Sequence, residues 1–195
     1  EDGIRDIGVT GVQTCALPIF FTTSHVGWLY ASDDLYEKLD MAKLPHAKTL
    51  YPDAVISPFH LGTWSYVYTI AYRPDLVPAD IKFTSWADLW NPKLKGTIGL
   101  PDFDPSHIMY ASAMLSGAKG AKDWAMGQKK LLELKPNIKA YYSSDATSQE
   151  KIGSGETPIQ VLLSGNAYHM MSQGVKIHLV VPKEGAVIGI DTVGI

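Results

Sequence analysis

The stretch SWADLWNPKLKGTIGLPDFDPSHIMYASAML, residues 85–115, carries the pattern that decides the fold. Ser85 can cap a short helix because its hydroxyl oxygen accepts a free backbone N–H, and the Asn-Pro that follows ends that helix. A strand is predicted over Thr97–Leu100. Asp104 followed by Pro105 is the usual order of an N-cap and a first helical residue, so a second helix is predicted to the end of the stretch. Helix, strand and helix in succession indicate an α/β protein.

The rest of the chain continues this alternation. Tyr66–Tyr72 is rich in β-branched and aromatic residues and ends at Arg73-Pro74-Asp75, which predicts a strand followed by a turn. The pattern predicts further strands over Ile138–Tyr142, Pro158–Leu163 and Lys176–Val181, and helices over Ser32–Leu39, Lys119–Leu134, Ala146–Ile152 and Gly165–Gln173. Helices between strands favour a parallel or mixed sheet that is covered on both faces.

Composition excludes several classes of protein. With 46% hydrophobic and 19% charged residues the chain is ordinary globular protein, and its net charge of -3 comes with no basic stripe, which argues against a nucleic-acid partner. No apolar run approaches the roughly 18 residues that cross a bilayer, and no signal peptide opens the chain. If the protein is exported, its signal peptide is missing from this fragment.

Residues 1–19 resemble the translation of a sequencing-library adapter. Val9–Ile19 matches such a translation residue by residue, and Glu1–Asp6 matches the upstream part of the same primer. We therefore expect an adapter-derived artefact here, exclude it from fold reasoning and expect a truncated protein. The only cysteine, Cys15, lies in this segment, so the remaining chain offers no disulfide, thiolate nucleophile or cysteine-ligated metal.

Several short segments occur in an order and at a spacing that together form one pattern: Ser85–Gly96, Gly99–Asp102, Gly155-Glu156, Ser164–Tyr168, and Pro182–Ala186 followed by Asp191. Together they resemble the bacterial extracellular solute-binding proteins of ABC importers, in their spermidine/putrescine-like group. The resemblance implies a periplasmic-binding-protein-like α/β fold of two lobes that close on a solute, with mostly the second lobe present.

The resemblance also implies a domain organisation and a function. Residues 20–68 would form the tail of lobe one and the hinge strand, 69–180 lobe two, and 181–195 the return crossing toward lobe one. The implied protein is a periplasmic or extracytoplasmic monomer without a cofactor. It would capture a small polar solute, polyamine-like and cationic in the leading version, and deliver it to a membrane permease.

Ligand-binding residues are expected just after strands, because ligands of open α/β sheets gather outside the carboxyl ends of the strands and between domains. On this ground we expect Asp102, Asp104, Ser106, Ser164 and Asn166 to bind ligand. The resemblance adds Trp64 and Ser65, which lie just before the predicted strand Tyr66–Tyr72, and Asp191. Five of these residues have a structural alternative. Asp104, Ser164 and Asn166 can cap helices, Trp64 can belong to a core, and Asp191 can be a surface carboxylate at a strand end.

The polyamine assignment has points against it. Phe103 and Ser106 stand where polyamine-binding relatives carry two acidic residues three apart. Gly189 and Leu163 replace aromatic residues that would stack on a cationic solute.

Other functions remain as alternatives. Tyr141-Tyr142 raises ferric-ion binding, but the pair precedes Gly155-Glu156 and falls in a predicted strand, where neighbouring side chains face opposite ways. The histidines lack metal-ligand spacing, so no metal is expected. An anion- or phosphonate-binding protein of the same fold and a purely structural domain are further alternatives. We predict no enzyme, because there is no Gly-x-Ser-x-Gly elbow and no Gly-rich phosphate loop.

Overall fold

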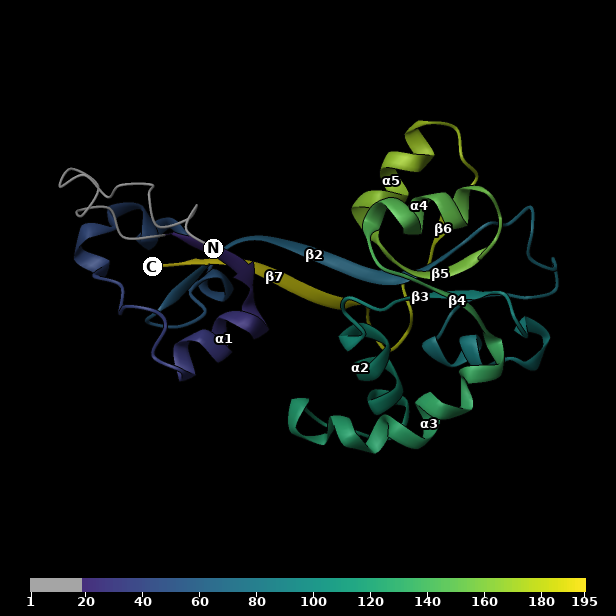
Figure 1. Ribbon diagram of the computed structural model, residues 1–195, viewed down its shortest axis with the longest axis horizontal. Coiled ribbons are helices and arrows are strands. Elements are labelled where there is room, and N and C mark those ends of the chain that lie inside the picture. The colour runs from purple at the N-terminus through teal and green to yellow at the C-terminus, as the bar shows by residue number, and fades with distance from the viewer. Residues whose placement is uncertain (1–18) are drawn as a thin grey trace, which may run out of the picture. The chain divides into compact units, whose positions relative to one another are not determined.

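The computed structural model describes residues 19–195 (Figure 1), so nearly all of the adapter-like segment lies outside the described residues. The described chain divides into two compact units. The smaller unit comprises the residues up to Ser65 together with Gly189–Ile195, and the larger unit is Tyr66–Ile188. Two strands run from one unit into the other, β2 (His60–Tyr72) and β7 (Val187–Gly194).

The smaller unit holds little regular structure. Strand β1 (Phe20–Thr23) pairs antiparallel with the end of β7, and helix α1 (Ser24–Ser32) follows it. Three short 3-10 helices complete it, at Met41–Lys43, Pro45–Thr49 and Pro52–Ala54. Large apolar side chains that are at least half exposed here include Phe21, Trp28, Leu29, Leu35 and Tyr51.

The helix predicted over Ser32–Leu39 is wrong. Ser32 ends helix α1, and its hydroxyl group donates to the carbonyl oxygen of Trp28 at 2.8 Å. Asp34 has a φ of 55°, in the left-handed region, which stops a right-handed helix. The Ser-Asp-Asp sequence that resembles a helix start is therefore a helix end.

The larger unit is built on a mixed sheet, as predicted. Strands β3, β4 and β5 run parallel with β3 in the middle, and β2 pairs antiparallel with β5. A short strand β6 pairs with the other side of β2. The bounds are Ile98–Pro101 for β3, Ile138–Tyr142 for β4, Ile159–Leu163 for β5 and His178–Leu179 for β6.

Helices cover both faces of this sheet. In Figure 1, α4 and α5 lie on one side of the strands and α2 and α3 on the other. Consecutive strand residues alternate between the two cores: Ile70 and Val161 join one, and their neighbours Ala71 and Leu162 join the other. The helix bounds are Ser106–Leu115 for α2, Gln128–Glu133 for α3, Asp145–Gly153 for α4 and Ser164–Ser172 for α5.

Two predicted elements are shorter than the sequence pattern suggests. The helix expected over Lys119–Leu134 is a 3-10 helix at Ala121–Gly127 followed by α3. Gly127 packs so closely on α2 that an added Cβ would lie 2.5 Å from the Ala113 nitrogen, so the backbone at this point follows the packing against α2. The strand expected over Lys176–Val181 is reduced to the two residues of β6.

Hydrogen bonds join the segment at Ser85-Trp86 to Glu184-Gly185, near the start of β7. Ser85 caps a 3-10 helix at Trp86–Trp90 with a capping box. The Glu184 carboxylate accepts from the Ser85 hydroxyl group at 2.5 Å and from the Trp86 N–H at 3.2 Å, and the Trp86 indole N–H donates to the Gly185 carbonyl oxygen at 2.8 Å. Burial opposes ionisation of Glu184, but these hydrogen bonds outweigh it and hold the pKa of Glu184 below its ordinary value.

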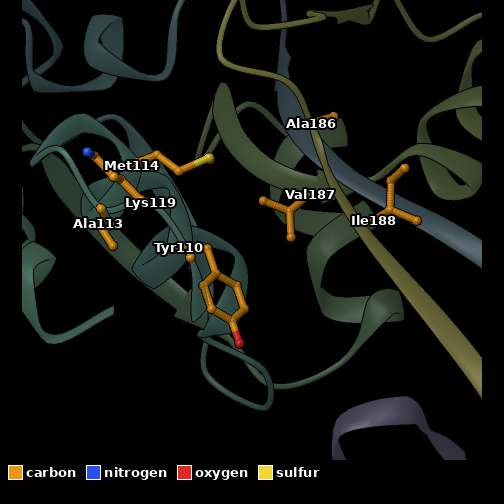
Figure 2. A pocket seen from close by; sticks show the side chains of 9 residues that line it. Tyr110, Ala113, Met114, Lys119, Ala186, Val187 and Ile188 are labelled. Atoms are coloured by element: carbon orange, nitrogen blue, oxygen red, sulfur yellow. The ribbon is translucent and has the colours of Figure 1, made fainter. Parts of the chain in front are cut away.

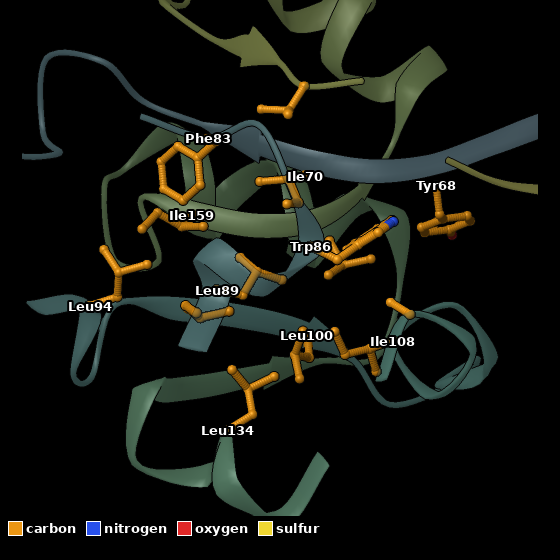
Figure 3. Packing of buried hydrophobic residues seen from close by; sticks show 14 of the residues in the cluster. Tyr68, Ile70, Phe83, Trp86, Leu89, Leu94, Leu100, Ile108, Leu134 and Ile159 are labelled. Carbon is orange, nitrogen blue, oxygen red and sulfur yellow. The ribbon is translucent and has the colours of Figure 1, made fainter. Parts of the chain in front are cut away.

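Trp86 is fully buried in the core shown in Figure 3, beside Leu89 and Leu100. We expect Trp86→Ala to lower the free energy of unfolding by about 3–5 kcal/mol, because the lost indole leaves a cavity and an unpaired carbonyl. Trp124, which is 49% exposed, is the matched control, and Trp124→Ala should cost much less. Urea unfolding of both variants checks this, and similar losses would contradict the packing described.

The low pKa of Glu184 predicts a pH-dependent stability. A carboxyl group whose folded pKa is depressed contributes stability that is present above its ordinary pKa and is lost as the pH falls through the folded value. Glu184→Gln should therefore destabilise the protein more at pH 7 than at pH 3, with Glu133→Gln on exposed α3 as the control. Urea titrations at both pH values measure the difference, and an equal loss at both would count against it.

Candidate functional site

The carboxyl ends of the parallel strands in the larger unit meet at one edge of its sheet. Strands β3, β4 and β5 end there, and helices α2, α4 and α5 begin just beyond them. Because β2 is antiparallel to β5, Tyr68 pairs with Leu163 at the same edge. We call this the carboxyl edge. It gathers short polar loops from three strands, as expected for a ligand site of an α/β sheet.

Three expected site residues lie together in the loop between β3 and α2. Asp102 is exposed, and its backbone N–H donates to the Tyr142 carbonyl oxygen at 3.1 Å, which joins this loop to the end of β4. The Asp104 carboxylate accepts from the backbone N–H of Ser106 at 3.1 Å. Asp104 therefore does cap α2, while its side chain stays 18% exposed. Ser106 is the first residue of that helix.

Two expected site residues begin α5 at the same edge. Ser164 and Asn166 were expected to cap this helix, but α5 has no side-chain cap. The side-chain nitrogen of Asn166 is buried and finds no hydrogen-bond acceptor among the described residues. The capping interpretation of both residues is therefore wrong.

An aromatic cluster at the carboxyl edge was missed by the sequence analysis. The His107 ring stacks on Tyr68, with centroids 3.9 Å apart and an interplanar angle of 28°. Tyr66 lies edge-on to Tyr68 at 6.0 Å and 6.3 Å from His107. The sequence offers no signal for this set, because it depends on how α2 packs against β2.

The other expected site residues belong to the smaller unit. Trp64 is 58% exposed, so it is not part of a core, and Ser65 beside it is also exposed. Asp191 lies in β7, where it pairs with Thr23 of β1, and its backbone carbonyl oxygen accepts from the Thr63 hydroxyl group at 3.0 Å.

The loops at the carboxyl edge carry negative charge. Segments 102–106, 143–145 and 164–166 contain three carboxylates, Asp102, Asp104 and Asp145, and no lysine or arginine. The positive ends of α2 and α4 attract Asp104 and Asp145, which partly offsets their charge. This edge is therefore suited to a solute with a positive group, which a carboxylate binds through charge-assisted hydrogen bonds.

The tyrosine pair does not form a metal site. Tyr141 is 56% exposed and Tyr142 is 2% exposed, so the two phenols lie on opposite faces of β4, as predicted. Burial, together with the nearby Tyr68 and Asp145, raises the pKa of Tyr142 well above its ordinary value, and its hydroxyl group donates to the Val161 carbonyl oxygen. Across residues 19–195 no group of three histidine, cysteine or acidic side chains is placed to hold a metal ion.

A separate apolar hollow of about 400 Å³ lies beside α2 (Figure 2). Tyr110, Ala113 and Met114 of α2 line one side, and Ala186–Ile188 line the other. Figure 2 shows Met114 and Val187 pointing toward each other across it. None of the expected site residues lines this hollow.

Comparison with known proteins assigns the family. The family described as bacterial extracellular solute-binding protein matches residues 20–195. The chain belongs to the bacterial extracellular solute-binding proteins. In this solute-binding protein the match begins directly after the adapter-like segment.

Relatives of this solute-binding protein include spermidine/putrescine-binding periplasmic proteins. Protein 1 of that name from Haemophilus influenzae is 29% identical over 174 residues, which cover 85% of this chain and 48% of the relative. The Escherichia coli protein is also 29% identical over 174 residues, covering 84% of this chain and 49% of its own length. The chain thus spans about half the length of the curated relatives it matches.

Solved structures confirm the fold of this solute-binding protein. An ABC transporter protein from Clostridium perfringens superposes with a TM-score of 0.78 at 23% identity, covering 91% of this chain and 58% of that structure. The spermidine/putrescine ABC transporter substrate-binding protein from Streptococcus pneumoniae gives a TM-score of 0.71 at 22% identity, covering 93% and 58%. The expected periplasmic-binding-protein-like fold, present in part, is therefore confirmed. No helix among residues 19–195 is long and apolar enough to cross a membrane.

The two aspartates after β3 should differ in their effect on stability. Asp104→Ala removes the cap of α2 and should cost about 1 kcal/mol in the free energy of unfolding. Asp102→Ala, on the exposed part of the loop, should stay within about 0.5 kcal/mol of the wild type. Thermal and urea unfolding of both variants measures the two changes in the free energy of unfolding. Equal losses in the two variants would show that Asp104 is not a cap.

Proposed function

We propose that this protein captures a small polar, cationic solute of the polyamine-like kind and delivers it to the permease of an ABC importer. The observation that carries the proposal is the family match over residues 20–195. The spermidine/putrescine-binding names of the relatives support the same solute class. The negative loops and the tyrosine faces at the carboxyl edge supply the chemistry that such a solute requires.

Capture of this kind uses two lobes. In the proposed arrangement residues 20–68 are the tail of lobe one and the hinge strand, 69–180 are lobe two, and 181–195 return to lobe one. Closure is favoured only by ligand contacts that the open form lacks, so both lobes must contribute polar groups. We assign Asp102, Asp104, Ser106, Ser164 and Asn166 to lobe two and Trp64, Ser65 and Asp191 to the other side.

The solute is proposed as cationic for a reason that is visible at the carboxyl edge. Leu163 and Gly189 leave two aromatic positions of polyamine-binding relatives empty, but Tyr66 lies at the same edge as Leu163 and presents an aromatic surface there. A ferric-ion or anion site of the same fold would need paired phenolates or cationic side chains. The opposite faces of Tyr141 and Tyr142 and the acidic loops argue against both.

The proposed site of action is extracytoplasmic, as the periplasmic names of the relatives suggest, and the proposed complete protein is a monomer without a cofactor. Binding and release need no chemical step. We therefore propose a binding protein and not an enzyme.

Calorimetric titration of the full-length protein tests the proposal. Putrescine, spermidine, a small amino-acid-like cation, a phosphonate and ferric ion form the panel. We expect saturable binding of one of the cations, unchanged solute after dialysis, and at least about tenfold weaker binding in Asp102→Asn, since a carboxylate bonded to an ammonium group contributes about 1.5–3 kcal/mol. Turnover of the solute, or tight binding only of the phosphonate or the ferric ion, would overturn it.

A further inference from the structure

His107 occupies a fixed position between the aromatic cluster and the loop after β3. It is the second residue of α2 and is 2% exposed. Its ring stacks on Tyr68, and its Nδ1 atom lies 3.8 Å from the Oδ2 atom of Asp104. The other oxygen of Asp104 accepts from the Ser106 N–H. The Asp104 carboxylate is thus bonded to the start of the helix through one oxygen, and its other oxygen lies near a buried imidazole that can pair with it when the ring carries a proton.

We propose that His107 is a positioning residue of the solute site: in its neutral form it leaves the Asp104 carboxylate to a bound cation, and on taking up a proton it withdraws that carboxylate from the cation. This inference rests on the proposed function, because it concerns solute capture at the carboxyl edge. It assigns to His107 a role that neither its place in the sequence nor the family resemblance supplies.

The groups around His107 determine whether its ring takes up a proton. Asp104 faces it from the loop after β3, and Tyr66 and Tyr68 face it from β2. The phenols stay neutral through the range in which an imidazole titrates, between about pH 5 and 8. Helix α2 carries no lysine, arginine, aspartate or glutamate. Burial of the ring and the positive end of the helix disfavour an imidazolium, and Asp104 favours one.

Protonation of His107 would weaken cation binding in two ways. An imidazolium ring 3.8 Å from the carboxylate forms an ion pair that competes with a solute ammonium group, and it also repels that group directly. Over the same pH range the ammonium groups of a polyamine and an aspartate keep their charge. A change in solute affinity between pH 8 and 5.5 would therefore reflect protonation of His107.

The test is calorimetric titration of the full-length protein with putrescine at pH 8 and pH 5.5. We expect the wild-type Kd to rise about tenfold or more at the lower pH. An opposite charge at this distance interacts with a carboxylate by an amount equivalent to about 1–3 pK units, and each unit corresponds to a tenfold change in binding. His107→Phe keeps a ring against Tyr68 but binds no proton, so its Kd should be the same at both pH values. A purely structural histidine would not produce this difference between pH profiles.

The matched control is His178→Phe on β6, an exposed ring that contacts Tyr72 and lies outside the loops of the carboxyl edge. It should keep the wild-type pH dependence. If His107→Phe does not fold, Asp104→Asn serves instead, with weak and pH-independent binding expected.

The outcomes separate the two proposals. A wild type that binds putrescine equally at both pH values, or a His107→Phe variant that keeps the wild-type pH dependence, overturns the role of His107 and leaves solute capture standing. A wild type that binds no member of the wider panel overturns the proposed function and the role of His107 together.

Discussion

Burial of the central strands on both faces is the constraint on which the rest of the larger unit depends. Ile70 and Val161 enter one core while Ala71 and Leu162 enter the other, so a shift of one residue in either strand would exchange the two sets. The register of β2 on β5 is therefore fixed by packing. Fixed registers bring the ends of β3, β4 and β5 to one edge, and this alignment gathers polar loops that are far apart in the sequence.

At that edge the same side chain stabilises the fold and is proposed to bind the solute. Asp104 stabilises the start of α2 by accepting the Ser106 N–H, so its carboxylate has a defined direction before any solute arrives. A preorganised carboxylate loses little entropy on binding, which benefits affinity. Asp102, on the exposed part of the same loop, lacks that restraint and is free to adapt to a solute.

Much of the larger unit could be predicted from sequence because its local signals agree with its packing. Ser85 caps its helix, Asp104 caps α2, and the strand ending at Tyr72 is followed by the expected turn at Arg73. The errors have physical causes. Asp34 adopts a left-handed conformation that turns a helix-start pattern into a helix end, and Gly127 packs against α2 where the sequence pattern suggested a continuous helix. The stacking of His107 on Tyr68 depends on long-range packing, which no local pattern encodes.

The smaller unit has a consequence for the behaviour of this chain in solution. Phe21, Trp28, Leu29, Leu35 and Tyr51 give it an apolar surface, although it lies outside both of the cores of the larger unit. Apolar surface of this kind favours self-association. A segment or partner that covers these side chains would therefore make the chain more soluble without any change in the two cores.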